Sequence, residues 1–340
     1  MSADTAPSPV RAASPPGCPA CGAPGRVPLS YGPSQAGFTV TRCSGCGLGV
    51  TTPLPSPAQL DALYPPTHYG SGGPRYRPAV ERVAVSFRRS RAAWISRLHP
   101  PGSVLEVGCG HGYLLAALRD LGWTVQGVEL HDDSAAYGRK VLQLPIAVGE
   151  LATLRFPAAA FDVVVFWHSF EHLPDPAAAL REAIRVLKPG GLVIVAVPNM
   201  SSWQARWAGR HWFHWEIPRH LFHFDATTLG GLFHRAGLDI VRVSHANWEQ
   251  NPFGWMQSVF NKLGFPANQF FAGLWAVPNG GRQAPSSAPG RSSAARPIVQ
   301  RLLAPPLLLG GFLLAAVETA CQRGGTMTVV GRPAARAGER

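Results

Sequence analysis

Acidic residues, basic runs and long apolar runs are all scarce in this 340-residue chain. Only 19 residues are Asp or Glu, against 31 Lys and Arg, so the formal net charge is +12. No block of five or more basic residues occurs, so this charge fits an ordinary basic surface as well as an anionic partner. The first 17 residues lack an apolar core run, which predicts a disordered lead-in to a cytoplasmic protein without a secretory signal there.

Apolar residues are nevertheless sufficient for a substantial core, because 46% of the chain is hydrophobic. Strand-like runs at Val104–Val107 and Thr124–Val128 enclose a helical stretch at Tyr113–Leu121. Phe161–Trp167 and Leu192–Val197 are continuous apolar runs, which are typical of strands buried on both faces. We therefore predict an α/β domain with a doubly wound parallel sheet covered by helices.

Four of the six cysteines form two Cys-x-x-Cys pairs, Cys18 with Cys21 and Cys43 with Cys46. Glycine follows the second cysteine of each pair and permits a tight turn that directs both thiolates at one ion. Four thiolates leave no open coordination position, which predicts a structural zinc site in a ribbon over residues 18–50. A vestigial ribbon without metal is the alternative.

A glycine-rich turn follows the first predicted strand of the main domain and reads Glu106-Val-Gly108-Cys-Gly110-His-Gly112. Such glycines let the backbone approach a ligand at the carboxyl end of a sheet. A dinucleotide site also requires an acid about 20 residues further on, and Glu129 meets that requirement. The G-x-G-x-G spacing is tighter than the dinucleotide pattern, which argues against that ligand.

These residues, read as Val104-Leu-Glu-Val-Gly-Cys-Gly-His-Gly112, resemble the first motif of the class I S-adenosylmethionine-dependent methyltransferases. The resemblance continues through Gly127-Val-Glu129-Leu, Phe161-Asp-Val-Val-Val165, Glu171-His-Leu173 and Leu187-Lys-Pro-Gly-Gly191. It implies a Rossmann-like seven-stranded sheet, S-adenosylmethionine as cofactor and an enzyme that transfers its methyl group.

The resemblance also implies which residues contact the cofactor. The glycines would line its methionine end, Glu129 would accept the ribose hydroxyls, and Glu150 replaces the more common Asp near the adenine. Glu106 could act directly or support the loop. The implied set is Glu106, Gly108, Cys109, Gly110, His111, Gly112, Glu129, Leu130, Glu150, Leu151, Trp167 and His168.

A segment rich in histidine and tryptophan spans Trp207–Phe224 and resembles a bacterial methyltransferase subgroup with a Pro-Arg-His-Leu-x-His-Phe stretch, often associated with glycans and secondary metabolites. It offers bases and stacking surfaces on the ligand side of the sheet. We predict catalytic roles for His220, His223 and His172. The alternatives are histidines satisfied by backbone carbonyls and, less favoured because no acid lies at suitable spacing, a second metal site.

The stretch Thr326–Gly331 fits the last, antiparallel strand of this fold, which makes residues 248–323 a hydrophobic insert between two neighbouring strands. Its uncharged run Leu302–Val317 is 16 residues long, short of the roughly 20 that span a bilayer. Both flanking strands belong to one sheet, so the insert would have to cross a membrane an even number of times. We therefore predict an interfacial or re-entrant hairpin at the membrane, with a substrate lid or dimer contact as alternatives.

The predicted function is methyl transfer from S-adenosylmethionine to a small-molecule or lipid-linked acceptor, such as a hydroxyl of a sugar or metabolite. A ribosomal RNA base methyltransferase is the alternative, although Asn/Asp-Pro-Pro-Tyr is absent after the fourth strand. A non-catalytic cofactor-binding scaffold is the second. The predicted organisation is 1–17 disordered, 18–50 zinc ribbon, 51–99 connector and helix, 100–247 methyltransferase domain, 248–323 insert, 324–333 last strand and 334–340 tail.

Overall fold

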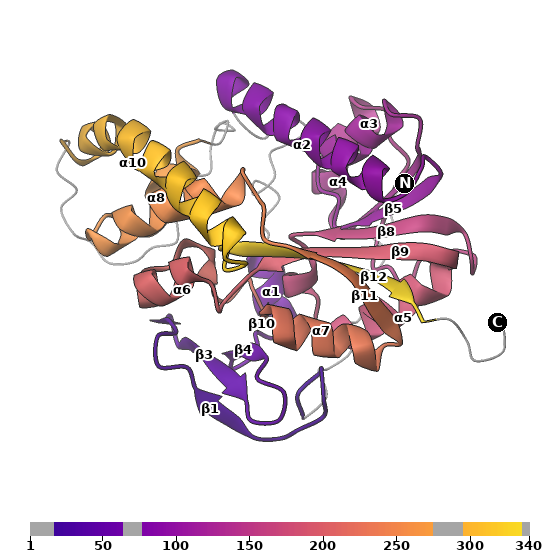
Figure 1. Cartoon of the computed structure of the whole chain (residues 1–340), viewed down its shortest axis with the longest axis horizontal. Helices are drawn as coiled ribbons and strands as arrows, with labels where there is room; N and C mark the ends of the chain where they lie inside the picture. The colour runs from indigo at the N-terminus through magenta and orange to yellow at the C-terminus, as the bar shows by residue number, and fades with distance from the viewer. Residues whose placement is uncertain (1–16, 64–76, 275–294, 335–340) are drawn as a thin grey trace, which may run out of the picture.

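The computed structural model describes residues 17–63, 77–274 and 295–334, without the side chains of 295–297 (Figure 1). The predicted disordered lead-in and the C-terminal tail therefore lie almost entirely outside the described residues. The same holds for part of the connector after residue 63 and for part of the insert before residue 295.

A seven-stranded sheet forms the centre of the molecule, in the order β11-β12-β9-β8-β5-β6-β7. The four pairings among β5 to β9 are parallel, and β12 runs antiparallel to both of its neighbours, β9 and β11. The predicted α/β class with an antiparallel last strand is thereby confirmed. The strands are β5 Ser103–Val107, β6 Thr124–Glu129, β7 Ile146–Val148, β8 Phe161–Trp167, β9 Leu187–Pro198, β11 Leu238–Ser244 and β12 Thr326–Pro333.

Helices cover both faces of this sheet (Figure 1). One face carries α2 (Pro78–Leu98), α3 (Tyr113–Arg119) and α4 (Asp132–Lys140), and the other carries α5 (Pro176–Val186) and α7 (Ala226–Arg235). Helix α4 and the short strand β7 were not predicted. Two Asp residues in the first turn of α4 stabilise the helix through its dipole. The same residues interrupt the apolar periodicity from which a helix is predicted.

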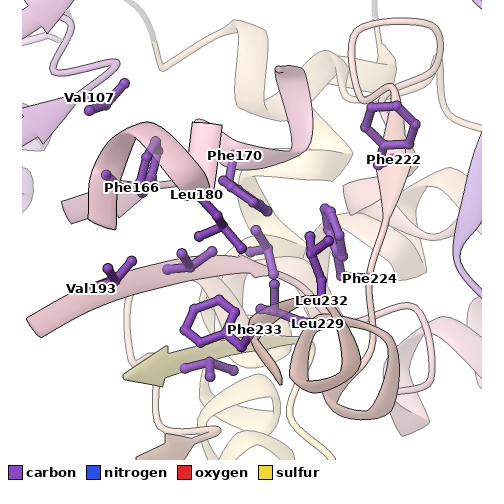
Figure 2. Close-up of a cluster of buried hydrophobic side chains, with 14 of the residues drawn as sticks. Val107, Phe166, Phe170, Leu180, Val193, Phe222, Phe224, Leu229, Leu232 and Phe233 are labelled. Atoms are coloured by element: carbon purple, nitrogen blue, oxygen red, sulfur yellow. The ribbon is translucent and has the colours of Figure 1, made fainter. Parts of the chain in front are cut away.

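The central strands are continuous apolar runs because successive side chains serve two cores. Val163 and Val165 of β8 face the core beneath α2 and α3, whereas Phe166 faces the core beneath α5 and α7. Figure 2 shows this second core, to which Phe233 of α7 and Val193 of β9 both contribute. All five side chains are less than 2% exposed. The sheet is therefore packed tightly on both faces.

Aspartate side chains cap the N-termini of two helices. Asp175 caps α5 by accepting a hydrogen bond from the Ala178 amide at 2.8 Å. Asp225 caps α7, and Thr228 returns the hydrogen bond in a capping box. Helix α5 ends at Val186, and residues 188–191 lie within the first part of β9.

The N-terminal ribbon is a small sheet that a strand from the main domain completes. Its own strands are β1 (Arg26–Pro28), β2 (Ser34–Gln35), β3 (Phe38–Cys43) and β4 (Gly49–Thr52), followed by helix α1 (Pro57–Ala62). The completing strand is β10, Phe222–His223, which pairs antiparallel with β4. The ribbon therefore attaches directly to the histidine-rich segment, a contact that the sequence did not predict.

In its described residues, the insert between β11 and β12 contains three helices. They are α8 (Gln250–Lys262), α9 (Gln269–Ala272) and α10 (Ala295–Ala320). Helix α10 packs along α8 and projects beyond the sheet (Figure 1). It has 26 residues and contains Pro305 and Pro306, so it is longer than the uncharged run suggested. Between β9 and β10 lie α6 (Trp203–Ala208), η3 (Gly209–His211) and η4 (Phe213–Trp215), and η2 (Phe170–His172) follows β8.

Candidate active site

A cavity of about 530 Å³ lies at the carboxyl ends of β5, β6 and β8. This is the edge where the strand order reverses, the usual ligand position in open α/β sheets. We call it the central cavity. It brings together eleven of the twelve residues predicted to contact the cofactor, namely Glu106, Gly108, Cys109, Gly110, His111, Glu129, Leu130, Glu150, Leu151, Trp167 and His168.

The glycine-rich turn requires glycine at two positions on the cavity. Gly108 has a φ of +74°, and a Cβ there would lie 2.5 Å from the Cβ of Ser169. Gly110 has a φ of +53° and open space around it. Gly112 is the twelfth predicted residue and does not line the cavity. It begins α3 with a φ of +76°, where a Cβ would lie 2.5 Å from Leu144, so its role is to shape the turn.

Glu129 ties this turn to the end of β6. One carboxylate oxygen accepts a hydrogen bond from the Gly110 amide and the other from the Leu130 amide, each at 2.9 Å. Burial raises the pKa of Glu129 despite these hydrogen bonds. Oε1 also accepts a hydrogen bond from the His131 amide at 3.4 Å, so the second lone pair of Oε2 remains to accept a hydrogen bond from a ribose hydroxyl while the group fixes the turn.

Glu106 presents an unsatisfied acceptor to the same cavity. It is 5% exposed, and its Oε2 accepts no hydrogen bond from any described residue. Burial raises the pKa of Glu106 to about 8, against the opposing effect of Arg91 and Arg88. A buried carboxylate of this kind needs a donor, and the ammonium group of the methionine part of S-adenosylmethionine would supply one. The residues present therefore fit the cofactor.

Two arginines of α2 form a further wall that the sequence did not predict. Arg88 and Arg91 both pair with Glu249 at the start of the insert, Arg91 at 2.8 Å. The Arg91 guanidinium also lies 3.9 Å from the ring centroid of Trp167. Burial, together with the nearby Arg88, lowers the pKa of Arg91 to about 9. The insert thus connects electrostatically to the cavity wall.

Two of the three predicted catalytic histidines, His172 and His220, line the cavity. The Nδ1 of His220 lies 2.9 Å from the carbonyl oxygen of His214, and the Nδ1 of His172 lies 3.0 Å from that of Arg219. A ring nitrogen next to a carbonyl oxygen carries the proton, so both rings present Nε2 as the basic atom. Burial lowers the pKa of both side chains, which favours the neutral imidazole.

The prediction for His223 is corrected by the structure, because this residue does not line the cavity. It lies in β10, where its Nε2 is 3.1 Å from the Thr51 hydroxyl and its ring packs on Trp215. Burial lowers its pKa to about 3. His223 is therefore a buried histidine of the interface between β10 and the ribbon.

Thr51 of the ribbon holds the segment that carries His220. Its hydroxyl donates to the His220 carbonyl oxygen at 2.5 Å, and its amide donates to the Leu221 carbonyl at 3.0 Å. Thr51 is fully buried. The ribbon consequently fixes the backbone beside a histidine of the cavity.

Glu171 is a cavity residue for which the sequence predicted no role. It is 1% exposed, and its Oε1 lies 3.5 Å from Nδ1 of His168 and 4.0 Å from Nε2 of His220. The sequence offers no acid at a suitable spacing from the histidines of the Trp207–Phe224 segment, but the fold brings Glu171 of η2 to one of them, His220. The Glu171-His172 pair directly after β8 was the available signal.

The four predicted zinc ligands converge in the ribbon. Cys18 and Cys46 have their sulfurs 3.7 Å apart, Cys21 and Cys43 have theirs 3.6 Å apart, and all four sulfurs lie within 4.8 Å of one another. A tetrahedral zinc site with bonds of about 2.3 Å places its sulfurs about 3.8 Å apart, so this cluster fits one zinc ion.

Comparison with known proteins agrees with this geometry. Residues 80–243 match the family model described as a methyltransferase domain. A Mycolicibacterium smegmatis protein named "Probable S-adenosylmethionine-dependent methyltransferase" is 32% identical over 49% of this chain and 65% of its own length. The 2-methyl-6-phytyl-1,4-hydroquinone methyltransferase of Synechocystis is 32% identical over 38% of this chain and 42% of its own length.

A third relative is the ubiquinone biosynthesis O-methyltransferase of Idiomarina loihiensis, 36% identical over 29% of this chain and 44% of its own length. The chain thus spans between 42% and 65% of these relatives. The solved [4+2]-cyclase SpnF is similar in fold, with a TM-score of 0.50 at 18% identity over 83% of this chain and 98% of its own. Residues 80–243 are therefore similar to a methyltransferase domain, and the chain is similar to proteins named as S-adenosylmethionine-dependent methyltransferases.

Proposed function

We propose that this chain transfers the methyl group of S-adenosylmethionine to a hydroxyl of a small-molecule or lipid-linked acceptor. The observation that carries the proposal is the composition of the central cavity. One cavity holds the glycine-rich turn, the carboxylates of Glu106 and Glu129, and the neutral histidines His172 and His220. Cofactor-binding groups and proton acceptors therefore face the same space.

S-adenosylmethionine, when bound, supplies an electrophilic methyl group on its sulfonium. The chain's own residues then have to hold the acceptor in line, exclude water and take up the hydroxyl proton. His172 and His220 are suited to the last task, because their imidazoles are neutral and their Nδ1 atoms are fixed by backbone carbonyls. Trp167 and Phe213 supply apolar cavity wall.

The acceptor is proposed from the relatives and from the insert. Two relatives are named for a phytyl-hydroquinone and for O-methylation in ubiquinone biosynthesis, which supports a hydroxyl on a small or lipid-linked molecule rather than an RNA base. Gln250 and Phe271 of the insert line the central cavity. The insert is therefore placed to select the acceptor.

We also propose that α10 contacts a membrane surface from the cytoplasmic side. Leu302, Leu309 and Leu313 are 70%, 66% and 67% exposed, and their spacing places them on one side of the helix. Among the described residues, one helix, Ile298–Ala320, is long and apolar enough to cross a bilayer. The insert that contains this helix connects two adjacent strands of a single sheet. A helix that lies along the membrane surface is therefore favoured over one that crosses the membrane once.

Four clustered thiolates support a structural zinc ion in the ribbon, which would hold β4 and therefore Thr51 in place. The ion would act on the cavity through the hydrogen bonds from Thr51 to His220 and Leu221.

The proposed function is tested by calorimetry with S-adenosylmethionine, followed by labelled-methyl transfer into extracts of a strain that lacks this protein. We expect cofactor binding and a labelled small molecule or lipid. Binding without any labelled product would favour a scaffold, and label in RNA would favour the base methyltransferase.

A further inference from the structure

We propose that Glu171, His172 and His220 bind a divalent transition-metal ion on the acceptor side of the central cavity. Each residue offers one ligand atom, and the three atoms lie within 4.8 Å of one another. Glu171 and His172 come from η2, whereas His220 comes from the segment before β10. The tertiary fold thus assembles two imidazoles and one carboxylate, a donor set that suits zinc, iron and cobalt.

The first argument is the state of the Glu171 carboxylate. This side chain is 1% exposed, and neither of its oxygens accepts a hydrogen bond from any described residue. A buried carboxylate without donors is costly unless it is paired with a cation or a metal. Nδ1 of His168 lies 3.5 Å from Oε1 of Glu171, and Nε2 of His220 lies 4.0 Å from it.

The second argument is the orientation of the two histidines. Metal-binding histidines almost always donate the proton of the other ring nitrogen to a carbonyl or carboxylate, which fixes the ring. His220 and His172 both meet this condition, with Nδ1 at 2.9 Å and 3.0 Å from backbone carbonyl oxygens. Thr51 in turn holds the His220 carbonyl from the ribbon side. The rings are therefore held before any ion arrives.

The third argument is the position of the cluster. All three residues line the central cavity beside Trp167 and His168. Three protein ligands leave at least one coordination position open to the cavity. This inference rests on the proposed function, because the open position would bind the acceptor oxygen.

The chemistry follows from that geometry. With the Nε2 atoms of His172 and His220 bound to the ion, the metal would replace these histidines in activating the hydroxyl. A hydroxyl bound to the ion would lose its proton to solvent more readily, because the metal would stabilise the resulting oxyanion. The oxygen–carbon bond then forms as the sulfur–carbon bond breaks, and the sulfur retains the electron pair of the broken bond. The proton balance closes, and no oxidant or reductant is required.

The test uses the full chain, with the ribbon already loaded with zinc and its zinc content measured by elemental analysis. Cobalt(II) is titrated in and followed by absorption. We expect one additional cobalt per chain, with weak visible d–d bands and no thiolate-to-cobalt charge transfer in the near ultraviolet. Charge-transfer bands would instead place the cobalt in the ribbon and overturn the proposal, as would the absence of an additional equivalent.

The variants Glu171→Gln and His220→Ala should each weaken cobalt binding by at least roughly 100-fold. Replacing a residue that only supports a metal ligand costs up to about 100-fold in affinity, and loss of a ligand itself should cost no less. His211→Ala is the matched control, because His211 lies in the same histidine-rich segment but does not line the cavity. It should leave cobalt affinity unchanged. Equal cobalt affinity in all three variants would overturn the assignment.

Titration of each protein with S-adenosylmethionine separates the two proposals and reports folding, since the cluster is not part of the predicted cofactor contacts. Unchanged cofactor affinity with lost cobalt supports the metal site. Cofactor binding by the wild type without additional cobalt overturns the metal site alone, whereas cobalt binding without cofactor binding overturns the proposed function alone. If a variant fails to fold, the wild-type stoichiometry still decides.

Discussion

Glu318 in α10 allows a quantitative test of how the insert is anchored. This side chain is fully buried and accepts hydrogen bonds from the Gln204 amide and the Trp255 indole, both at 2.9 Å. Burial raises its pKa from 4.5 to about 7, which corresponds to about 3 kcal/mol between its two protonation states. Helix α10 is thus held to α6 and α8 by an acid that resists ionisation.

The sign of the effect follows from linkage. The pKa of Glu318 is higher in the folded chain, so the folded state holds the proton more tightly and stability falls as pH rises from about 4.5 to 7. Glu318→Gln cannot ionise. Relative to the wild type, its free energy of unfolding should therefore rise by about 2.5 kcal/mol between pH 5 and pH 8. At pH 5 the variant should be less stable by about 1 kcal/mol, because an amide cannot accept both hydrogen bonds as well.

Urea unfolding at pH 5, 6, 7 and 8, followed by tryptophan fluorescence and circular dichroism, measures this difference. Equal m-values would show that both proteins expose the same surface. Glu249→Gln is the matched control. Burial would raise the pKa of Glu249, but Arg88 and Arg91 outweigh it and lower that pKa. Its stabilisation is lost only as pH falls below the ordinary value of 4.5, so the Glu249→Gln difference should stay nearly constant from pH 5 to 8. A pH-independent Glu318→Gln difference would refute the reasoning.

Four further predictions concern the site and the ribbon. Gly108→Ala should weaken S-adenosylmethionine binding by at least about tenfold, through a strained φ that costs on the order of 1–3 kcal/mol and the contact with Ser169; calorimetry measures this. Gly190→Ala, with a φ of +78° but nothing within 4 Å, is the control, and equal weakening in both variants would contradict a local effect. Thr51→Val should destabilise the fold by about 1–3 kcal/mol and slow labelled-methyl transfer, whereas unchanged transfer would show that the ribbon does not position His220. Cys43→Ser should lower the zinc content by one equivalent per chain relative to the wild type, measured by elemental analysis, and an unchanged zinc content would exclude the ribbon site. Leu309→Glu should reduce sedimentation with vesicles of anionic phospholipid, and undiminished sedimentation would exclude α10 as the contact.

Sequence patterns alone predicted most of the sheet and named eleven residues that line the central cavity. The length of the continuous apolar runs predicted the buried strands, since a strand covered on both faces must be apolar throughout. The glycine-rich turn and Glu129 were found because ligand approach demands particular backbone conformations at fixed spacing. The two cysteine pairs predicted the ribbon for the same reason, because metal geometry restricts where thiolates can stand.

Only the tertiary structure shows which histidines reach the central cavity. His220 and His223 lie three positions apart in one motif, yet only His220 reaches the cavity, because β10 turns His223 toward the ribbon. Glu171 joins the histidines from a segment about fifty residues earlier. No local pattern encodes that proximity, because it depends on how η2 packs against the segment before β10.

The insert shows the same division. The sequence determined that a hydrophobic stretch lies between two neighbouring strands, since the last strand has its own apolar signature. Only the structure showed that α10 extends to 26 residues and that the buried Glu318 anchors it. A single acid in an apolar helix is read from sequence as an interruption. Packed against Trp255 and the Gln204 amide, it is a point of attachment, because hydrogen bonds offset the cost of its burial.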